Sequence, residues 1–365
     1  MKFLHTADWQ IGMKATKLGD AGMRVREERL ISVKRTFEVA KNHNVEFILV
    51  AGDVFEDNAV DRTMIQQVVN IIGSFTNPVF IIPGNHDPLV PGSVWDHPAW
   101  KSAKNIHIAR EENHIEIPGG VLFLCPILEK HSGRNPTAWI PPEPKDQIRI
   151  GLAHGTVEGI RQDEPDYPIP RDAAQRLNLN YLALGHWHSY ASYTGSDNNQ
   201  SMAYSGTHET TKFGERESGN VLIVEIPSPK ASPTITCIRT GGLNWITLSK
   251  EVRTEKELES IRKNIETLED PSNTLIEINL SGLLMVKEQA ELDHIEQILH
   301  TRFLWGNLDI SNLRPSPEDD TWIRDLPPGI IQDAAMILRD NPGSSPEISA
   351  RALMELYAIV EEGVR

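Results

Sequence analysis

The stretch FILVAGDVF, residues 47–55, decides the fold: an apolar run long enough for one buried strand ends at the carboxylate of Asp53. Further stretches repeat this arrangement, with an apolar run followed by a polar side chain that can bind a metal. They are FLHTADWQ (3–10), VFIIPGNHD (79–87), IGLAHGT (150–156) and YLALGHWH (181–188). Ligands of open α/β sheets bind outside the carboxyl ends of the strands, so we expect these polar groups to converge there.

The polar groups at these strand ends are the oxygen and nitrogen donors that suit divalent metals. Taken singly, such residues are more often turn residues or helix caps than metal ligands. Their repetition at successive strand ends instead predicts a hydrolase that uses two metal ions. The candidate residues are Asp8, Gln10, Asp53, Asn85, His86, His154, His186 and His188.

This series of motifs resembles the calcineurin-like metallophosphoesterases. Within that superfamily, LHTADWQIG (4–12), GDVF (52–55) and GNHDPLVPGSVW (84–95) resemble the SbcD family, the nuclease subunits of SbcCD-like complexes that repair double-strand breaks. The motif match covers about residues 1–226. The resemblance implies a DNA nuclease that hydrolyses phosphodiester bonds with two divalent metal ions, Mn²⁺ being the expected metal and Mg²⁺ the alternative.

By position in the motifs, the resemblance also implies a role for each residue. Asp53 would bridge both ions, and His86 would protonate the leaving oxygen or steady the phosphate. The remaining ligands divide into two sets, Asp8 and His188 for one ion, and Asn85, His154 and His186 for the other.

One position departs from the family pattern. Where most of the superfamily has a second histidine in the first motif, this chain has Gln10. A neutral amide oxygen is a weaker donor than imidazole for transition metals. We therefore expect Gln10 to lie beside the Asp8 and His188 set and to weaken or retune that metal position.

Other histidines and the tryptophans outside the motifs give less specific predictions. His5 is expected to pack or to form hydrogen bonds near the core, because it precedes the end of its strand. Three histidines in apparent loops are expected at the surface: His97, His131 and His208. Trp95, Trp100 and Trp187 could stack on bases or pack in the interior, and the sequence leaves both open.

The order of secondary structure predicts an α/β fold. Strands at 2–6, 46–50 and 78–82 alternate with helices at about 24–43 and 61–75, which is typical of parallel βαβ units. Short strands near 105–108, 113–124, 148–152, 181–184, 189–204 and 219–226 suggest a second sheet. We expect a two-sheet metallophosphoesterase sandwich flanked by helices, with Pro-rich surface loops at 136–146 and 163–172.

Three domains are expected along the chain. Residues 1–240 form the metallophosphoesterase domain, and a βαβαβ pattern over 241–315 predicts a small α+β capping domain. Residues 316–365 contain two helices, near 328–340 and 345–362. The resemblance implies that the capping domain helps to shape access of DNA.

Composition agrees with an intracellular enzyme, and its charge would weaken the contact with DNA that the resemblance implies. The 36 basic and 51 acidic residues give a net charge of −15, which repels a phosphate backbone, so a partner would supply basic surface. Two cysteines, no signal peptide pattern and no apolar run of membrane-spanning length predict a cytoplasmic protein without a membrane.

Apolar stripes on three helices suggest partners. The stripes in IIQDAAMILRD (330–340) and ARALMELYAIVEE (350–362) pack on the chain itself or, as the resemblance implies, dock on an SbcC-like ATPase subunit. The stripe of helix 61–75 packs on the sheet, and the resemblance implies that helices of this region pair two subunits in a homodimer.

Two other functions stay open from the sequence. The same two metals could serve a phosphodiesterase or phosphatase that acts on a nucleotide or another small phosphate ester. Alternatively, the chain could be a scaffolding subunit with a weakened metal site that mainly binds an ATPase. The complete set of Asp53, Asn85, His86 and the three later histidines argues against the scaffold.

Overall fold

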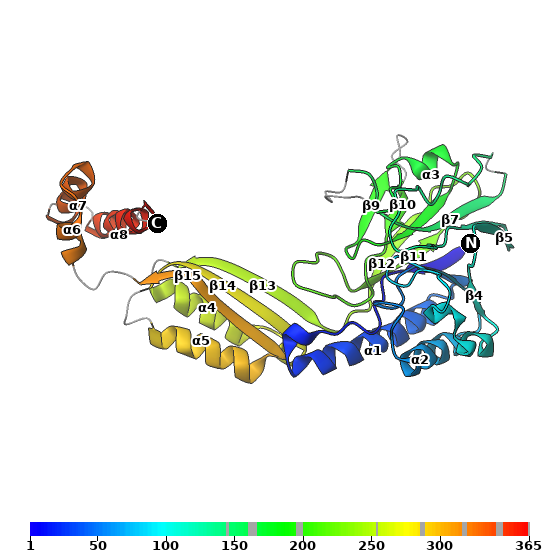
Figure 1. Ribbon diagram of the computed structural model, residues 1–365, viewed down its shortest axis with the longest axis horizontal. Coiled ribbons are helices and arrows are strands. Elements are labelled where there is room, and N and C mark those ends of the chain that lie inside the picture. Colours follow the sequence, from blue (N-terminus) through cyan, green and yellow to red (C-terminus); the bar gives the residue numbers. More distant parts are fainter. Residues whose placement is uncertain are drawn as a thin grey trace. The chain divides into compact units, whose positions relative to one another are not determined.

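The computed structural model describes residues 1–143, 146–159, 166–194, 200–252, 255–284, 289–315, 320–340 and 346–363 (Figure 1). The chain divides into two compact units, Met1–Asn244 and Trp245–Arg365, and each is described by itself. Parts of the expected loops 136–146 and 163–172 lie outside the described residues.

The first sheet of the amino-terminal unit has the order β12-β11-β1-β2-β3-β4. Its parallel strands are β1 (Lys2–Thr6), β2 (Phe47–Ala51), β3 (Val79–Ile82) and β4 (Ile106–Ile108), and β11 (Asn220–Glu225) and β12 (Thr234–Arg239) extend it antiparallel. Helices α1 (Ala21–Asn42) and α2 (Arg62–Gly73) are the crossovers between the parallel strands.

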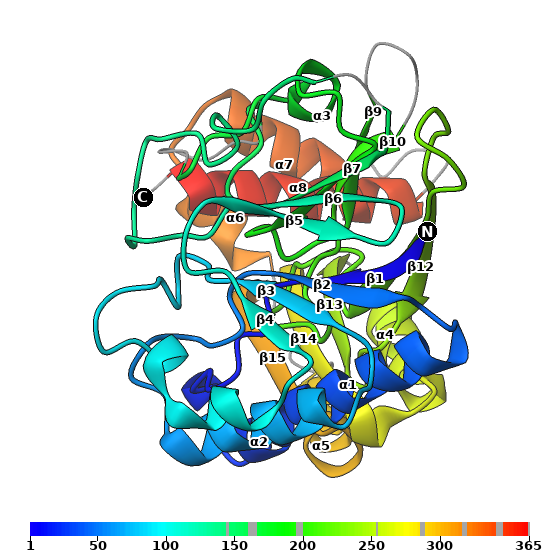
Figure 2. The same ribbon diagram turned by 90° about the vertical axis from the view of Figure 1, so that its right-hand side faces the viewer.

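Both faces of this sheet are covered, which explains the continuous apolar runs of its strands. Along β2, Ile48 and Val50 pack toward α1 and α2, whereas Leu49 and Ala51 pack toward the second sheet. Figure 2 shows α1 and α2 on the outer side of the first sheet and the second sheet on the other side.

The second sheet has the order β5-β6-β7-β8-β10-β9. It consists of β5 (Asn113–Ile117), β6 (Gly120–Leu124), β7 (Ile148–His154), β8 (Tyr181–Gly185), β10 (Gln200–Tyr204) and β9 (Ala191–Thr194). The short helix α3 (Ala173–Arg176) contributes Ala173 and Ala174 to a core on the outer face of this sheet. The predicted two-sheet sandwich is therefore confirmed.

The second unit begins with a three-stranded sheet of order β13-β14-β15. Its strands are β13 (Asn244–Val252), β14 (Thr274–Leu284) and β15 (Trp305–Pro315), and its helices are α4 (Glu255–Thr267) and α5 (Gln289–Arg302). Ile261 of α4 and Ile295 of α5 pack in one core with Ile276 and Ile278 of β14. The predicted βαβαβ order is thus present.

The same unit ends with three helices, α6 (Thr321–Asp325), α7 (Ile330–Asp340) and α8 (Pro346–Gly363). Ile323, Ala335 and Leu353 form a small core among them. The remaining short elements are the 3₁₀ helices η1 (Thr16–Leu18), η2 (Val94–Asp96), η3 (Pro98–Ser102) and η4 (Pro271–Asn273). In the part of the chain that the structure describes, no helix has the length and apolar character needed to cross a membrane.

Several features of the first unit differ from the sequence-based expectation or resolve it. The strands expected near 105–108 and 219–226 belong to the first sheet, as β4 and β11, and not to the second. Strand β12 was not predicted, because it is a largely exposed edge strand between segments rich in proline and glycine. Trp95 and Trp100 are buried and stack on each other with ring centroids 5.3 Å apart, so their role is packing. Trp187 is half-buried and packs beside the outer core of the second sheet.

Candidate metal centre

Three buried side chains meet where strands of the two sheets end. Donor atoms of Asp8, Asp53 and His154 all lie within 4.8 Å of one another. Asp8 follows β1, Asp53 follows β2, and His154 is the last residue of β7, so both sheets contribute. Asp53 Oδ2 lies 3.5 Å from His154 Nε2. Two carboxylates and an imidazole in this arrangement can hold a divalent cation.

The backbone that carries the carboxylates adopts a conformation uncommon for residues other than glycine. Asp8, Gln10 and Asp53 have φ angles of 53°, 49° and 53°, in the left-handed region, which costs about 1–3 kcal/mol per residue. Hydrogen bonds hold the turn, because Asp8 N donates to Gly52 O (3.1 Å) and Gln10 N donates to Asp53 O (3.0 Å). A Cβ at Gly84 would overlap the Asp53 carboxylate, so the approach of this loop requires glycine.

Asn85 joins two histidines of the second sheet to this cluster. Its Oδ1 lies 2.8 Å from His154 Nε2 and 2.9 Å from His186 Nδ1. His154 Nδ1 lies 2.8 Å from the Ala51 carbonyl oxygen and therefore donates its hydrogen there. The lone pair of His154 Nε2 then faces the lone pairs of the Asn85 oxygen. Acceptors that converge in this way fit a cation bound between them.

Burial disfavours the charged forms of Asp8, His154 and His186. The pKa of Asp8 is raised well above its usual value by burial and by the nearby Asp53 charge. Burial lowers the pKa of His154, and burial together with His154 lowers the pKa of His186 to about 4. The imidazoles are thus in the neutral form that binds metal, and a divalent ion would favour the ionised carboxylates.

Gln10 lies against the central carboxylate. Its side chain is 2% exposed, and its Nε2 donates to Asp53 Oδ2 over 3.2 Å. The structure therefore places Gln10 at the predicted site. In this arrangement the amide nitrogen of Gln10 contacts Asp53, the carboxylate predicted to bridge the ions. Gln10 could bind a metal ion only if its amide group turned so that the oxygen faced the site.

His86 is half-buried at the rim of the cluster and is held through two groups. Its backbone N donates to Asp53 Oδ1 (2.9 Å), and its Nδ1 donates to the Glu56 carbonyl oxygen (2.9 Å). Because Nδ1 is engaged, Nε2 is the nitrogen left to meet a substrate. This geometry suits a group that transfers a proton to a leaving oxygen or binds the phosphate.

The two histidines of the GHWH segment have different partners. His186 contacts the cluster, whereas His188 contacts a glutamate. His186 N donates to Asp8 Oδ1 and Oδ2 over 3.0 and 3.1 Å. The ring of His188 instead lies with its Nδ1 2.8 Å from Glu215 Oε1 and 3.1 Å from the Thr211 hydroxyl. Burial acts to raise the pKa of Glu215, but hydrogen bonds from His188 and Thr211 outweigh it and leave this pKa lowered.

Three residues around the site were not given a role from the sequence. Asp87 ties two loops together, because its carboxylate accepts from Gly84 N (2.7 Å) and from Phe55 N (3.0 Å). Its pKa is raised to about 7 by burial and by Asp53. Its place in the GNHD motif was an available signal. The sequence held no such signal for Arg29 and Glu215, because each forms hydrogen bonds with residues far away along the chain.

The prediction that His208 lies at the surface was wrong. His208 is fully buried, its Nε2 contacts the Arg29 carbonyl oxygen (2.8 Å), and its ring lies 5.9 Å from that of Trp9. Burial and the nearby Arg29 lower its pKa well below the usual value. The reason is that Arg29 of α1 donates to the Glu209 carbonyl (2.9 Å) and draws this loop into the interior.

The other histidines follow the predictions more closely. His5 is buried, with its Nδ1 2.9 Å from the Tyr181 hydroxyl, as expected of a core residue. His131 is 73% exposed and lies 2.9 Å from Asp166. His97 is half-buried, because its ring accepts a hydrogen bond from Ala99 N.

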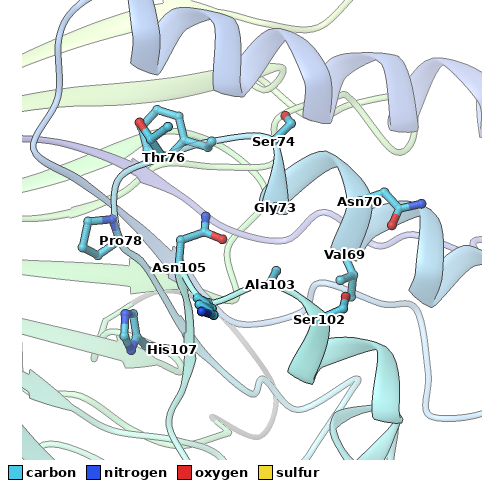
Figure 3. Close-up of a pocket in the computed structure, with 12 residues that line it drawn as sticks. Val69, Asn70, Gly73, Ser74, Thr76, Pro78, Ser102, Ala103, Asn105 and His107 are labelled. Atoms are coloured by element: carbon cyan, nitrogen blue, oxygen red, sulfur yellow. The ribbon is translucent and has the colours of Figure 1, made fainter.

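A separate cavity of about 760 Å³ lies at the opposite end of the parallel strands (Figure 3). It is lined by the carboxyl end of α2 and by the segments that lead into β3 and β4, including Asn70, Ser74, Asn105 and His107. Because the candidate ligands follow the carboxyl ends of β1, β2 and β3, this cavity is distinct from the metal centre.

Comparisons with known proteins bear on the family. The model of the family "Calcineurin-like phosphoesterase" matches residues 1–190. The curated "Uncharacterized metallophosphoesterase YhaO" of Bacillus subtilis (strain 168) is 25% identical over 207 residues, which is 52% of this chain and 48% of that protein. The chain therefore spans about half the length of this curated relative.

Among solved structures, TT1561 of Thermus thermophilus is 10% identical, with 66% of this chain and 98% of that chain covered and a TM-score of 0.44. Wild-type Vps29 complexed with Zn²⁺ from Entamoeba histolytica is also 10% identical, with 66% and 99% covered and a TM-score of 0.33.

Proposed function

The chain belongs to the calcineurin-like phosphoesterase family, whose members are metal-dependent hydrolases of phosphoesters, and from this premise we propose that it cleaves phosphodiester bonds of DNA. In this proposal it is the cytoplasmic nuclease subunit of an SbcCD-like complex for repair and end processing. The observation that carries the hydrolytic part is the convergence of Asp8, Asp53 and His154. The DNA part is supported by the SbcD-like segments 4–12, 52–55 and 84–95.

The proposed site holds two divalent ions, with Asp53 between them. Asp8, Gln10 and His188 would serve one ion, and Asn85, His154 and His186 the other. When bound, the ions would supply an activated water and neutralise charge on the phosphate. Mn²⁺ is the proposed metal and Mg²⁺ the alternative, because the donors mix carboxylate and amide oxygens with imidazole nitrogens.

The chain's own groups would position and protonate the substrate. The imidazolium form of His86, which donates from Nδ1 to the Glu56 carbonyl, would present Nε2–H to the leaving oxygen and deliver that proton there. Asp87 would keep the loop that carries His86 against the loop that carries Asp53, because its carboxylate bonds to both loops. This arrangement would leave a bound phosphodiester between the carboxylates and His86.

The carboxyl-terminal helices are proposed to bind an SbcC-like ATPase subunit. Isoleucines at five positions of α7 and α8 are strongly exposed: Ile330 (88%), Ile331 (51%), Ile337 (63%), Ile348 (69%) and Ile359 (61%). Short amphipathic helices need an apolar surface to cover such side chains. A partner is also needed for DNA binding, because the net charge of −15 opposes contact with phosphates.

A homodimer is the remaining proposed assembly. The apolar stripe of α2 is used within the chain, since Val68 and Ile72 are fully buried in the core of the first sheet. A dimer through this helix would therefore use its exposed polar face, which carries Gln66, Gln67 and Asn70.

One observation favours a second candidate function. The strongly negative charge is unfavourable for DNA but acceptable for a small substrate, so a phosphodiesterase or phosphatase acting on a nucleotide or similar ester fits the same site. The scaffold with a weakened metal site is the third candidate, and the only observation that favours it is Gln10 in place of histidine.

The deciding experiment offers the purified full chain three labelled substrates, linear duplex DNA, single-stranded DNA and bis-(p-nitrophenyl) phosphate, each with Mn²⁺ and with Mg²⁺. Asp53→Asn is the inactive control, and Asp172→Asn, an exposed carboxylate, is the matched control for the loss of one charge. Cleavage of DNA that Asp53→Asn abolishes would support the nuclease. If the small ester is cleaved but DNA is not, even after the ATPase is added, the result would favour the second candidate. No cleavage of any substrate would favour the scaffold.

A further inference from the structure

His188 is paired with a buried carboxylate. Glu215 has a side chain that is only 4% exposed, and its Oε1 lies 2.8 Å from His188 Nδ1. The Thr211 hydroxyl also donates to Glu215 Oε1 and lies 3.1 Å from His188 Nδ1. Glu215 Oε2 accepts from Thr211 N over 2.8 Å. Within the described residues, the polar contacts of the Glu215 carboxylate are thus with His188 and with Thr211 of its own turn.

The segment that carries Glu215 is fixed against the strand end that carries His188. Thr207 N donates to the His188 carbonyl (3.0 Å), and Tyr190 N donates to the Glu217 carbonyl (3.2 Å). A Cβ at Gly206 would lie 2.8 Å from the His188 carbonyl oxygen, so glycine permits this close approach. The backbone of His188 and its ring are thus both bound by the same segment.

Arg29 holds this segment from the other side. Its fully buried guanidinium donates to the carbonyl oxygens of Glu209 (2.9 Å) and Thr210 (3.3 Å). It also donates to the Trp9 carbonyl (2.9 Å), in the turn between Asp8 and Gln10. The turn that presents Glu215 is therefore anchored to the same part of the molecule that presents the first carboxylate of the metal centre.

We propose that Glu215 is a positioning residue that fixes His188 as the tautomer with its hydrogen on Nδ1 and so leaves the Nε2 lone pair free to bind a cation. The reason is that a carboxylate can only accept a hydrogen bond, so the nitrogen that faces it must carry the hydrogen. Carboxylate partners of this kind orient metal-binding histidines and increase their basicity. The inference rests on the proposed function, in which His188 is a metal ligand.

A purely structural role for Glu215 is the competing explanation. Its Oε2 satisfies the backbone N of Thr211 and could serve only to shape the turn from Thr211 to Glu215. Removal of such a contact would lower the stability of the fold. It would not change which ring nitrogen of His188 carries the hydrogen, and it would not weaken one metal position selectively.

The first test measures the tautomer directly in the full chain, labelled with ¹⁵N-histidine and freed of metal with chelator. Long-range ¹H–¹⁵N spectra distinguish Nδ1–H from Nε2–H, and the His188→Gln variant identifies the His188 signals. We expect His188 to carry its hydrogen on Nδ1. If it carries the hydrogen on Nε2 in the parent protein, the proposal is overturned, and no variant of Glu215 is needed for this conclusion.

The second test titrates Mn²⁺ by calorimetry into the parent chain and into Glu215→Gln. The substitution keeps the size of the side chain but removes the charge, and we expect about 10–100-fold weaker binding at one of two metal positions. Glu217→Gln is the matched control, since Glu217 is an exposed glutamate on the same segment, and it should bind Mn²⁺ as the parent does. A lowered melting temperature of Glu215→Gln with unchanged Mn²⁺ affinities would establish the structural role and overturn the proposal.

The same titration on His188→Gln separates this inference from the proposed function. If His188→Gln weakens Mn²⁺ binding but Glu215→Gln does not, His188 stands as a ligand and the role of Glu215 is overturned. If His188→Gln binds Mn²⁺ as tightly as the parent chain, the assignment of His188 to the metal centre falls, and the inference falls with it.

Discussion

Helices α2 and α7 both carry apolar stripes, but the stripe of α2 is buried and much of the stripe of α7 is exposed. Val68 and Ile72 of α2 are fully buried against the first sheet, whereas Ile330 and Ile337 of α7 are 88% and 63% exposed. The stripe in a sequence shows only that some surface should cover it, and the neighbouring elements decide whether that surface belongs to the same chain. The stripe of α2 is covered by its own chain, whereas that of α7 is partly left exposed.

This comparison separates the hydrolysis proposed for the amino-terminal unit from the docking proposed for α7 and α8. The largest expected effect is that of Asp53→Ala, which removes the central carboxylate. Hydrolysis should fall below detection under saturating Mn²⁺, while binding to the ATPase and the circular dichroism spectrum stay unchanged. The measurement is turnover of bis-(p-nitrophenyl) phosphate beside a pull-down of the ATPase. Full activity of Asp53→Ala at saturating metal would show that the site is assigned wrongly.

The next largest effect is expected for His86→Ala. Loss of a proton donor should reduce kcat by about 10²–10⁴-fold, while both metal ions remain bound, because the ring is engaged with Glu56 rather than with the predicted ligands. Turnover and metal content are measured on the same preparation. His131→Ala, which removes an exposed histidine, is the control and should leave kcat as it is. A His86→Ala variant that loses metal instead would make His86 a ligand.

Docking should respond to the exposed stripe alone. Ile337→Asp places a charge in the proposed interface and should weaken ATPase binding by about tenfold or more, the loss typical of a central interface residue. Deletion of residues 317–365 should abolish binding, and both changes should leave hydrolysis of the small ester intact. Ile31→Asp on α1, where Ile31 is 38% exposed, is the matched control. A deletion variant that is insoluble would indicate that these helices pack on the chain itself.

The smallest effect is expected for Gln10→His. Imidazole in place of the amide should tighten one metal position, so that activity at limiting Mn²⁺ rises severalfold and activity at saturation changes little. Gln10 N donates to Asp53 O through the backbone, so the turn should survive the substitution. The measurement is a Mn²⁺ titration of activity and of binding heat. Two equally tight positions in the parent chain, unaltered in Gln10→His, would contradict the idea.

The strand ends could be predicted from the sequence because they depend on local pattern. The apolar runs before Asp8, Asp53 and Asn85 marked strands, and parallel strands in one sheet place their carboxyl ends together. The left-handed backbone at Asp8 and Asp53 could not be predicted, because nothing in their side chains requires it. It follows from the hydrogen bonds between two strand tips that only the folded chain brings together.

The supporting residues were missed for a similar reason. Arg29 and Glu209 are 180 residues apart in the sequence, and Glu215 meets His188 across 27 residues. A buried arginine on an amphipathic helix has the pattern of a solvated residue until its partners are known. His208 was misplaced by the same argument, since its loop is polar in sequence and buried only through Arg29.

The candidate metal centre takes its donors from both sheets. Packing between the two sheets should therefore influence which size of ion the centre accepts. Asp53 follows a strand that packs through Leu49, whereas His154 ends a strand that packs through Leu152, and both leucines lie in the core between the sheets. Well-packed interiors transmit changes of volume rather than absorbing them. A larger or smaller side chain between the sheets would therefore move one half of the donor set relative to the other. Selectivity between a small ion such as Mg²⁺ and a larger one could then change through substitutions that never touch the metal.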